Sequence, residues 1–137
     1  MRDILFRGKR TDNKQWVEGY YVLIGDVNAN PYILRNNGKE TNLIRVAHST
    51  VGQYTGLTDK NGTKIFEGDI VAAEIEGGAY DQFVFPVGVV VFENGAFGRK
   101  DKKHFTPFAS YAPRVVFEVI GNIHENPELL KRGNDEW

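Results

Sequence analysis

The spacing of tight-turn signals is the feature that most constrains how this chain can fold. Asn-Gly pairs occur at Asn61-Gly62 and Asn94-Gly95, between stretches rich in β-branched and aromatic residues. Asn-Gly is a preferred two-residue link between antiparallel strands, because both residues tolerate positive φ. Asn37-Gly38 and the segment 67–69 add two further turns. The pattern therefore predicts many short strands, since helical periodicity is scarce between the turns.

Eight or nine short strands are expected. The main candidates are residues 4–7, 16–24, 32–35, 43–46, 70–75, 83–92 and 115–123, and residues 50–57 form a compact segment with two glycines. Pro86 lies inside one of them and indicates an edge position, a bend or a bulge, because proline donates no ladder hydrogen bond. Pro127 begins a short C-terminal helix. We predict an all-β domain, a small distorted barrel or sandwich, with barrel closure hiding strand edges. The alternative is an α+β arrangement with the helix across a barrel mouth.

Length and composition narrow the function classes. At 137 residues, the chain is expected to form one domain over residues 1–137, with a core large enough to need no disulfide or metal. Its net charge of −1 draws it neither to nucleic acid nor to anionic membranes as a whole. It has no cysteine, which excludes disulfides, thiolate nucleophiles and cysteine-based metal sites. No apolar run approaches a signal peptide or membrane helix, so a cytoplasmic protein is expected.

No catalytic, cofactor or metal site can be assembled from the sequence. The histidines His48, His104 and His124 lie far apart, and no serine stands in a nucleophile-elbow motif. Glu67 and Asp69 would suit acid–base chemistry or a divalent cation. A turn role, in which the carboxylate accepts backbone N–H groups, explains them better.

The same interpretation applies to Asp59. We therefore predict that the chain is not an enzyme and uses no cofactor. The remaining enzyme alternative requires a histidine to converge with Glu67, Asp69 or Glu118.

Two basic clusters are the candidates for nucleic-acid contact. They comprise Arg7, Lys9, Arg10 and Lys14 near the N-terminus, and Arg99, Lys100, Lys102 and Lys103 in a predicted charged loop over residues 99–104. Aromatic residues lie beside both clusters, and a cationic groove with stacking aromatics is typical of single-strand binding. The alternative is that both are solvated loops beside core aromatics.

Three strings give the chain a family resemblance. They are FRGKR with WVEG at residues 6–10 and 16–19, VGQYTGLTDKNGTKIFEGDIV at 51–71, and VIGNIHENPELL at 119–130. In this order they resemble the YopX-like family of phage and prophage proteins. The resemblance implies a phage or prophage origin in a bacterial host cell, a β-rich fold and a homo-oligomer. It implies no activity and no functional residue.

Three functional hypotheses remain. The first is a non-enzymatic binding or assembly module that engages a protein partner or itself. The second is a nucleic-acid-binding accessory protein, and the third is an enzyme.

Overall fold

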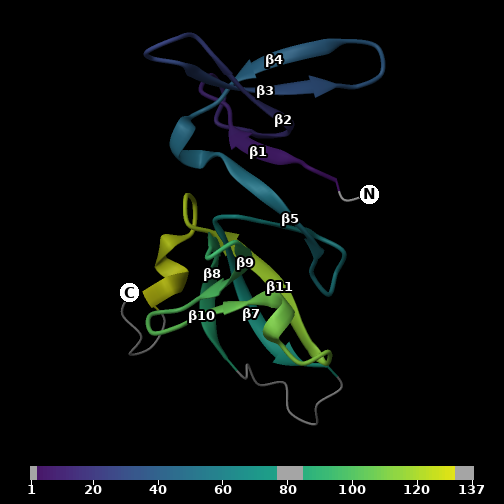
Figure 1. Ribbon diagram of the computed structural model, residues 1–137, viewed down its shortest axis with the longest axis vertical. Helices are drawn as coiled ribbons and strands as arrows, with labels where there is room; N and C mark the ends of the chain where they lie inside the picture. The colour runs from purple at the N-terminus through teal and green to yellow at the C-terminus, as the bar shows by residue number, and fades with distance from the viewer. Residues whose placement is uncertain (1–2, 77–84, 132–137) are drawn as a thin grey trace. The chain divides into compact units, whose positions relative to one another are not determined.

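The chain forms two compact units that follow one another in sequence. The computed structural model describes residues 3–76 and 85–131, and the units are Met1–Gly56 and Leu57–Trp137 (Figure 1). Each unit is contiguous in sequence. The expectation of a single domain over residues 1–137 stays a prediction, because it depends on whether the two units unfold together.

The first unit is a sheet of antiparallel strands. Its elements are β1 (Phe6–Lys9), β2 (Trp16–Ile24), β3 (Asn30–Asn36), β4 (Thr41–Arg45), the 3-10 helix η1 (His48–Thr50) and β5 (Gly52–Thr58). The strand order is β4-β3-β2-β1-β5-β6 in a six-stranded sheet, of which the last strand, β6 (Lys64–Phe66), belongs to the second unit by sequence. Strand β5 begins in the first unit and ends in the second. Strands β1 and β2 form an antiparallel hairpin.

One face of this sheet carries the core of the first unit. Val17, Ile33, Ile44 and Val46 form its buried cluster. Gly8 belongs to the same face, because a Cβ there would lie 2.9 Å from the Cβ of Val46. An antiparallel bridge joins Val46 to the residue after β1, so the chain beyond β4 returns to the start of the sheet. Only glycine allows this close approach at position 8.

The second unit is built on a five-stranded antiparallel sheet. Its elements are β7 (Asp69–Ile75), β8 (Phe85–Glu93), β9 (Ala96–Lys100), β10 (Phe105–Pro107), η2 (Phe108–Ser110), β11 (Val115–Asn122) and η3 (Pro127–Lys131). The order is β10-β9-β8-β7-β11, which places β7 between β8 and the last strand (Figure 1). Ile65, Val71 and Val90 are the buried centre of its core.

The predicted turn positions are confirmed, but the link at Asn61-Gly62 is longer than two residues, because residues 59–63 separate β5 from β6. Gly62 has a φ of 82°, and Asn94 and Gly95 have φ values of 51° and 79° in the two-residue link between β8 and β9. Pro86 lies in β8, an internal strand, where the pairing with β7 shifts register. The bulge, and not an edge position, is therefore how the sheet accommodates this proline.

The all-β fold class is confirmed, with two antiparallel sheets and no α-helix among the described residues. The short C-terminal helix is a 3-10 helix, η3. Both strand orders are open in the described residues, with β4 and β6 at the edges of one sheet and β10 and β11 at those of the other. The predicted barrel closure is therefore not observed in these two sheets. Across residues 3–76 and 85–131, no helix is long and apolar enough to cross a membrane.

One prediction about the second unit is wrong. The charged loop expected over residues 99–104 is shorter, because Arg99 and Lys100 lie inside β9 and pair with Thr106 and Phe105 of β10. Only residues 101–104 form the connecting turn.

Candidate functional site

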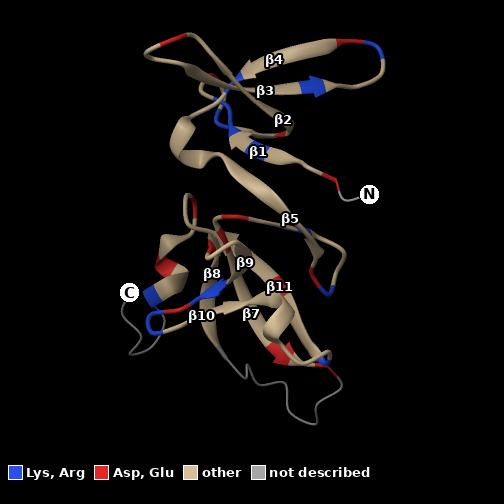
Figure 2. Ribbon diagram, viewed as in Figure 1, with Lys and Arg blue, Asp and Glu red and all other residues tan. Residues whose placement is uncertain are grey.

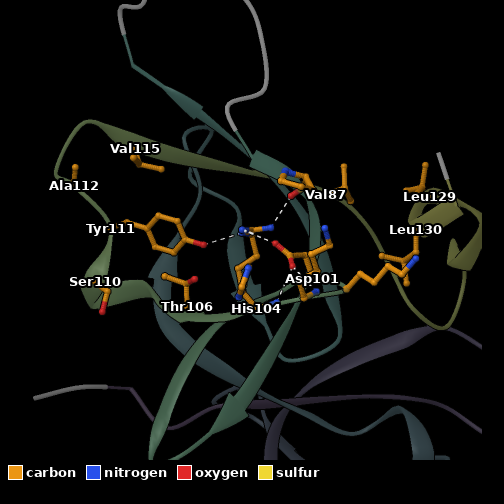
Figure 3. A pocket seen from close by; sticks show the side chains of 14 residues that line it. Val87, Asp101, His104, Thr106, Ser110, Tyr111, Ala112, Val115, Leu129 and Leu130 are labelled. Atoms are coloured by element: carbon orange, nitrogen blue, oxygen red, sulfur yellow. Dashed lines mark hydrogen bonds and ion pairs between the residues drawn. The ribbon is translucent and has the colours of Figure 1, made fainter. Parts of the chain in front are cut away.

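A pocket of about 620 Å³ opens in the second unit. Its lining comes from β8, β9, β10 and the turn before it, η2 with the segment after it, β11 and η3. The residues are Pro86, Val87, Arg99, Asp101, Lys102, Lys103, His104, Thr106, Ser110, Tyr111, Ala112, Val115, Leu129 and Leu130. Figure 3 shows Tyr111 and Val115 on one side of the pocket and Leu129 and Leu130 on the other, with a hydrogen-bonded network between them.

Arg99 is the centre of that network. Its Nε donates to the Tyr111 hydroxyl at 2.8 Å, Nη1 to the Pro86 carbonyl oxygen at 2.6 Å, and Nη2 to Asp101 Oδ2 at 3.1 Å. Its stem passes over β8, where a Cβ at position 88 would lie 2.5 Å from Arg99 Cγ, so Gly88 provides the space. The residue is 3 % exposed. Arg99 therefore has a structural role. Its guanidinium is buried, contrary to the predicted contact with nucleic-acid phosphate.

Asp101 holds the turn between β9 and β10. Its Oδ1 accepts the backbone N–H groups of Lys103 and His104, each at 2.9 Å. Burial is the largest single influence on the pKa of Asp101 and raises it, but these N–H groups and the charge of Arg99 together hold the pKa below its ordinary value. Asp101 is thus ionised at neutral pH and compensates Arg99.

Two exposed lysines make the rim of the pocket positive. Lys102 and Lys103 lie in the turn that Asp101 fixes, and both side chains are exposed. Figure 2 shows this blue turn beyond the end of β9. Since Arg99 and Asp101 balance each other, the two lysines set the net charge of the lining.

The pocket walls are apolar. Val87, Val115, Leu129 and Leu130 line it and are each half-buried. Tyr111 packs edge-on against a core phenylalanine of β11, with ring centroids 5.0 Å apart, so its ring is held in place. An apolar cavity with a few fixed polar groups and a charged rim is suited to binding an amphipathic ligand.

The N-terminal basic cluster lies in the other unit. Arg7 stacks on Trp16, with its guanidinium carbon 4.7 Å from the ring centroid. Arg10 pairs with Asp12 at 2.7 Å, and Lys14 is exposed in the loop after β1. The two predicted clusters therefore do not form one groove within either unit.

The remaining two predicted contacts are in strands. Lys9 lies in β1 beside Trp16 in the register of β1 and β2. Lys100 lies in β9 and pairs with Glu93.

Two of the carboxylates singled out in the sequence, Asp59 and Asp69, have structural roles. Asp59 accepts backbone N–H groups from Asn61, Thr63 and Val119, each at 2.9 Å. Asp69, 1 % exposed, accepts the N–H of Phe66 at 2.7 Å. The turn interpretation of both is confirmed.

The histidines are dispersed. His48 lies in η1 and His104 lies at the pocket rim. His124 lies beside Gly68, where an added Cβ would be 3.4 Å from His124 Nε2. His124 therefore lies close to the Glu67–Asp69 turn. Among the residues that the structure describes, no group of three or more histidine or acidic side chains is placed to hold a metal ion.

Sequence reasoning missed the pocket and the role of Tyr111. The Arg99-x-Asp101 spacing was visible, but a charged pair two residues apart also occurs in any solvated loop. The partners that decide the position of Arg99 are distant in sequence. Gly88 lies beside Arg99 because of the register of β8 and β9, and Tyr111 is brought to it by the segment that follows η2.

Comparison with known proteins identifies the lineage. The model of the family described as YopX protein matches residues 5–131. This chain belongs to the YopX family. The crystal structure of protein EF1440 from Enterococcus faecalis is similar to this YopX family member, with 24% sequence identity and a TM-score of 0.56, over 96% of this chain and 100% of that one. That likeness concerns the fold alone. A comparison with curated proteins finds no match.

Proposed function

We propose that this YopX family member is a non-enzymatic binding module whose pocket in the second unit receives an acidic, apolar segment of a protein partner. The observation that carries the proposal is the pairing of an apolar cavity of about 620 Å³ with an exposed lysine pair at its rim. The family resemblance supports a phage or prophage setting for this module.

The pocket is preformed, which favours binding. Arg99 is tied to Pro86, Asp101 and Tyr111, and Asp101 is tied to the turn backbone. The polar lining is therefore stable without a ligand, and little conformational entropy is lost when one enters. The volume lies within the range of roughly 300–1,000 Å³ that is common for ligand sites.

The lining indicates the chemistry of the ligand. Leu129, Leu130 and Val115 offer apolar surface to a partner's apolar side chain, the kind of anchor that fills a pocket at an interface. Lys102 and Lys103 then favour carboxylates beside that anchor, and charges at an interface rim act mainly on specificity and association rate.

Two hexapeptides of reversed charge test the proposal. One carries leucine and phenylalanine between glutamates, and the other has lysine in place of each glutamate. We expect the acidic peptide to bind roughly five- to thirtyfold more tightly in isothermal titration calorimetry, since each exposed ion pair contributes up to about 1 kcal/mol. The double variant Lys102→Glu with Lys103→Glu should reverse the preference. Lys39→Glu, an exposed site in the other unit, is the matched control.

The outcomes separate the alternatives. If both peptides bind equally, or if the double variant keeps the preference, the lysine pair does not contribute to ligand binding. Absence of binding by either peptide at millimolar concentration overturns the proposal. Leu130→Asp should weaken the acidic peptide if the apolar wall contributes.

A further inference from the structure

We infer that the outward face of the first unit's sheet binds single-stranded nucleic acid. The face consists of the outward residues of β1 to β4, of which Arg7, Lys9, Trp16, Tyr20, Tyr32 and Arg45 carry the argument. It lies in a different unit from the pocket, and it is independent of the function proposed there.

The alternation of the strands defines this face. Val17, Ile33 and Ile44 point into the core, so their neighbours along each strand point outward. Tyr20 is 62 % exposed and Leu43 is 50 % exposed. In a four-stranded antiparallel region, such large exposed side chains on one face mark a surface used for contact.

Aromatic rings and cations alternate across the face. Lys9 pairs with Trp16 and Tyr32 with Arg45 in the strand register. The guanidinium carbon of Arg45 is 5.9 Å from the Tyr32 ring centroid. Tyr20 and Tyr32 are diagonal neighbours on adjacent strands, a relation that places side chains about 7–8 Å apart. Successive rings on a sheet are platforms on which successive bases stack, whatever their sequence.

The charge of the face complements phosphate. Its outward positions carry three cations, Arg7, Lys9 and Arg45, and one carboxylate, Glu18, which lies opposite Arg7. The chain as a whole has a net charge of −1, so the positive charge is local. Bases stacked within a duplex cannot stack on protein rings, and for this reason the partner is a single strand.

Fluorescence anisotropy of a labelled twelve-nucleotide oligothymidine tests the inference. We expect binding at 50 mM salt, and a weaker signal from a duplex of equal length. Tyr20→Ala and Tyr32→Ala should each weaken binding about fivefold or more, the effect of losing one base–aromatic stack. Arg45→Gln should reduce the dependence of log K on log salt by roughly 0.7, the value for one single-strand phosphate contact.

Controls distinguish this face from other surfaces. Phe92→Ala removes an exposed aromatic ring from the second unit and should leave binding unchanged, and Lys102→Glu with Lys103→Glu should do the same. Circular dichroism establishes that each variant is folded.

Three results would overturn the inference. The first is no oligonucleotide binding at 50 mM salt, and the second is binding lost with the lysine pair but not with the tyrosines. The third is a dimer in light scattering that Tyr20→Ala dissociates without any oligonucleotide binding, which would make the face a contact between copies of this chain.

Discussion

Replacement of Asp59 by asparagine measures how strongly one buried carboxylate holds the second unit together. Asp59, 8 % exposed, joins the turn between β5 and β6 to β11, sixty residues further along the chain. Its Oδ1 accepts two N–H groups of the turn, and its Oδ2 accepts the N–H of Val119, all at 2.9 Å. Asparagine keeps one acceptor oxygen but presents an amide NH₂ to Val119, so two donors face each other.

The expected loss in the free energy of unfolding is about 3 kcal/mol. One hydrogen bond to a charged group contributes roughly 1.5–3 kcal/mol, and the other two weaken when the carboxylate charge is lost. Urea unfolding followed by circular dichroism measures the loss at pH 7. Asp3→Asn is the control, because it removes one exposed charge from outside this network.

The pH dependence gives a second readout. Burial is the largest influence on the pKa of Asp59 and raises it, but the N–H groups of Val119, Thr63 and Asn61 together lower the pKa below its ordinary value. The stabilisation is therefore complete above the unfolded pKa of about 3.9 and is lost as the pH falls through the folded pKa. The difference from Asp59→Asn should be constant above about pH 5 and shrink in acid. A loss below about 1 kcal/mol, or one unchanged down to pH 2, would refute the reasoning.

Two further substitutions test the second sheet. Arg99→Lys keeps the charge but loses the planar fork that reaches Tyr111 and Pro86. It should lower the free energy of urea unfolding by about 2–3 kcal/mol, and a loss within 0.5 kcal/mol would contradict the structural role. Gly98→Ala places a Cβ 2.4 Å from the Thr106 carbonyl oxygen and should separate β9 from β10. Amide hydrogen exchange should then become faster in the β9–β10 hairpin and stay unchanged in β7.

The turn chemistry made much of this fold predictable. Asn-Gly pairs specify local backbone angles, so their positions set where β5 and β8 end and the next strands begin. Asp59 and Asp69 were also correctly interpreted, because a carboxylate at a tight turn finds its N–H partners within a few residues.

The candidate pocket was not predictable for the opposite reason. Whether Arg99 is exposed or buried depends on its neighbours across the sheet, because the residues next to it in the sequence do not distinguish a solvated loop from a buried strand position. Gly88 has no side chain to block the Arg99 stem, and the Tyr111 hydroxyl, which lies outside the sheet, accepts a hydrogen bond from Arg99 Nε. Sheet closure was expected because closed sheets lack edges, but local turn signals do not specify how many strands a sheet has or where it stops.

The position of β11 has a consequence for synthesis. Strand β7 meets β8 on one side and the much later β11 on the other. As the chain leaves the ribosome, β7 to β10 emerge first, and one side of the buried strand β7 must wait for residues 115–122. During that interval Ile70 to Ala73 offer unpaired backbone groups on an apolar strand, a template for association between nascent chains. A translational pause before β11 would therefore reduce the soluble yield more than a pause of equal length after it.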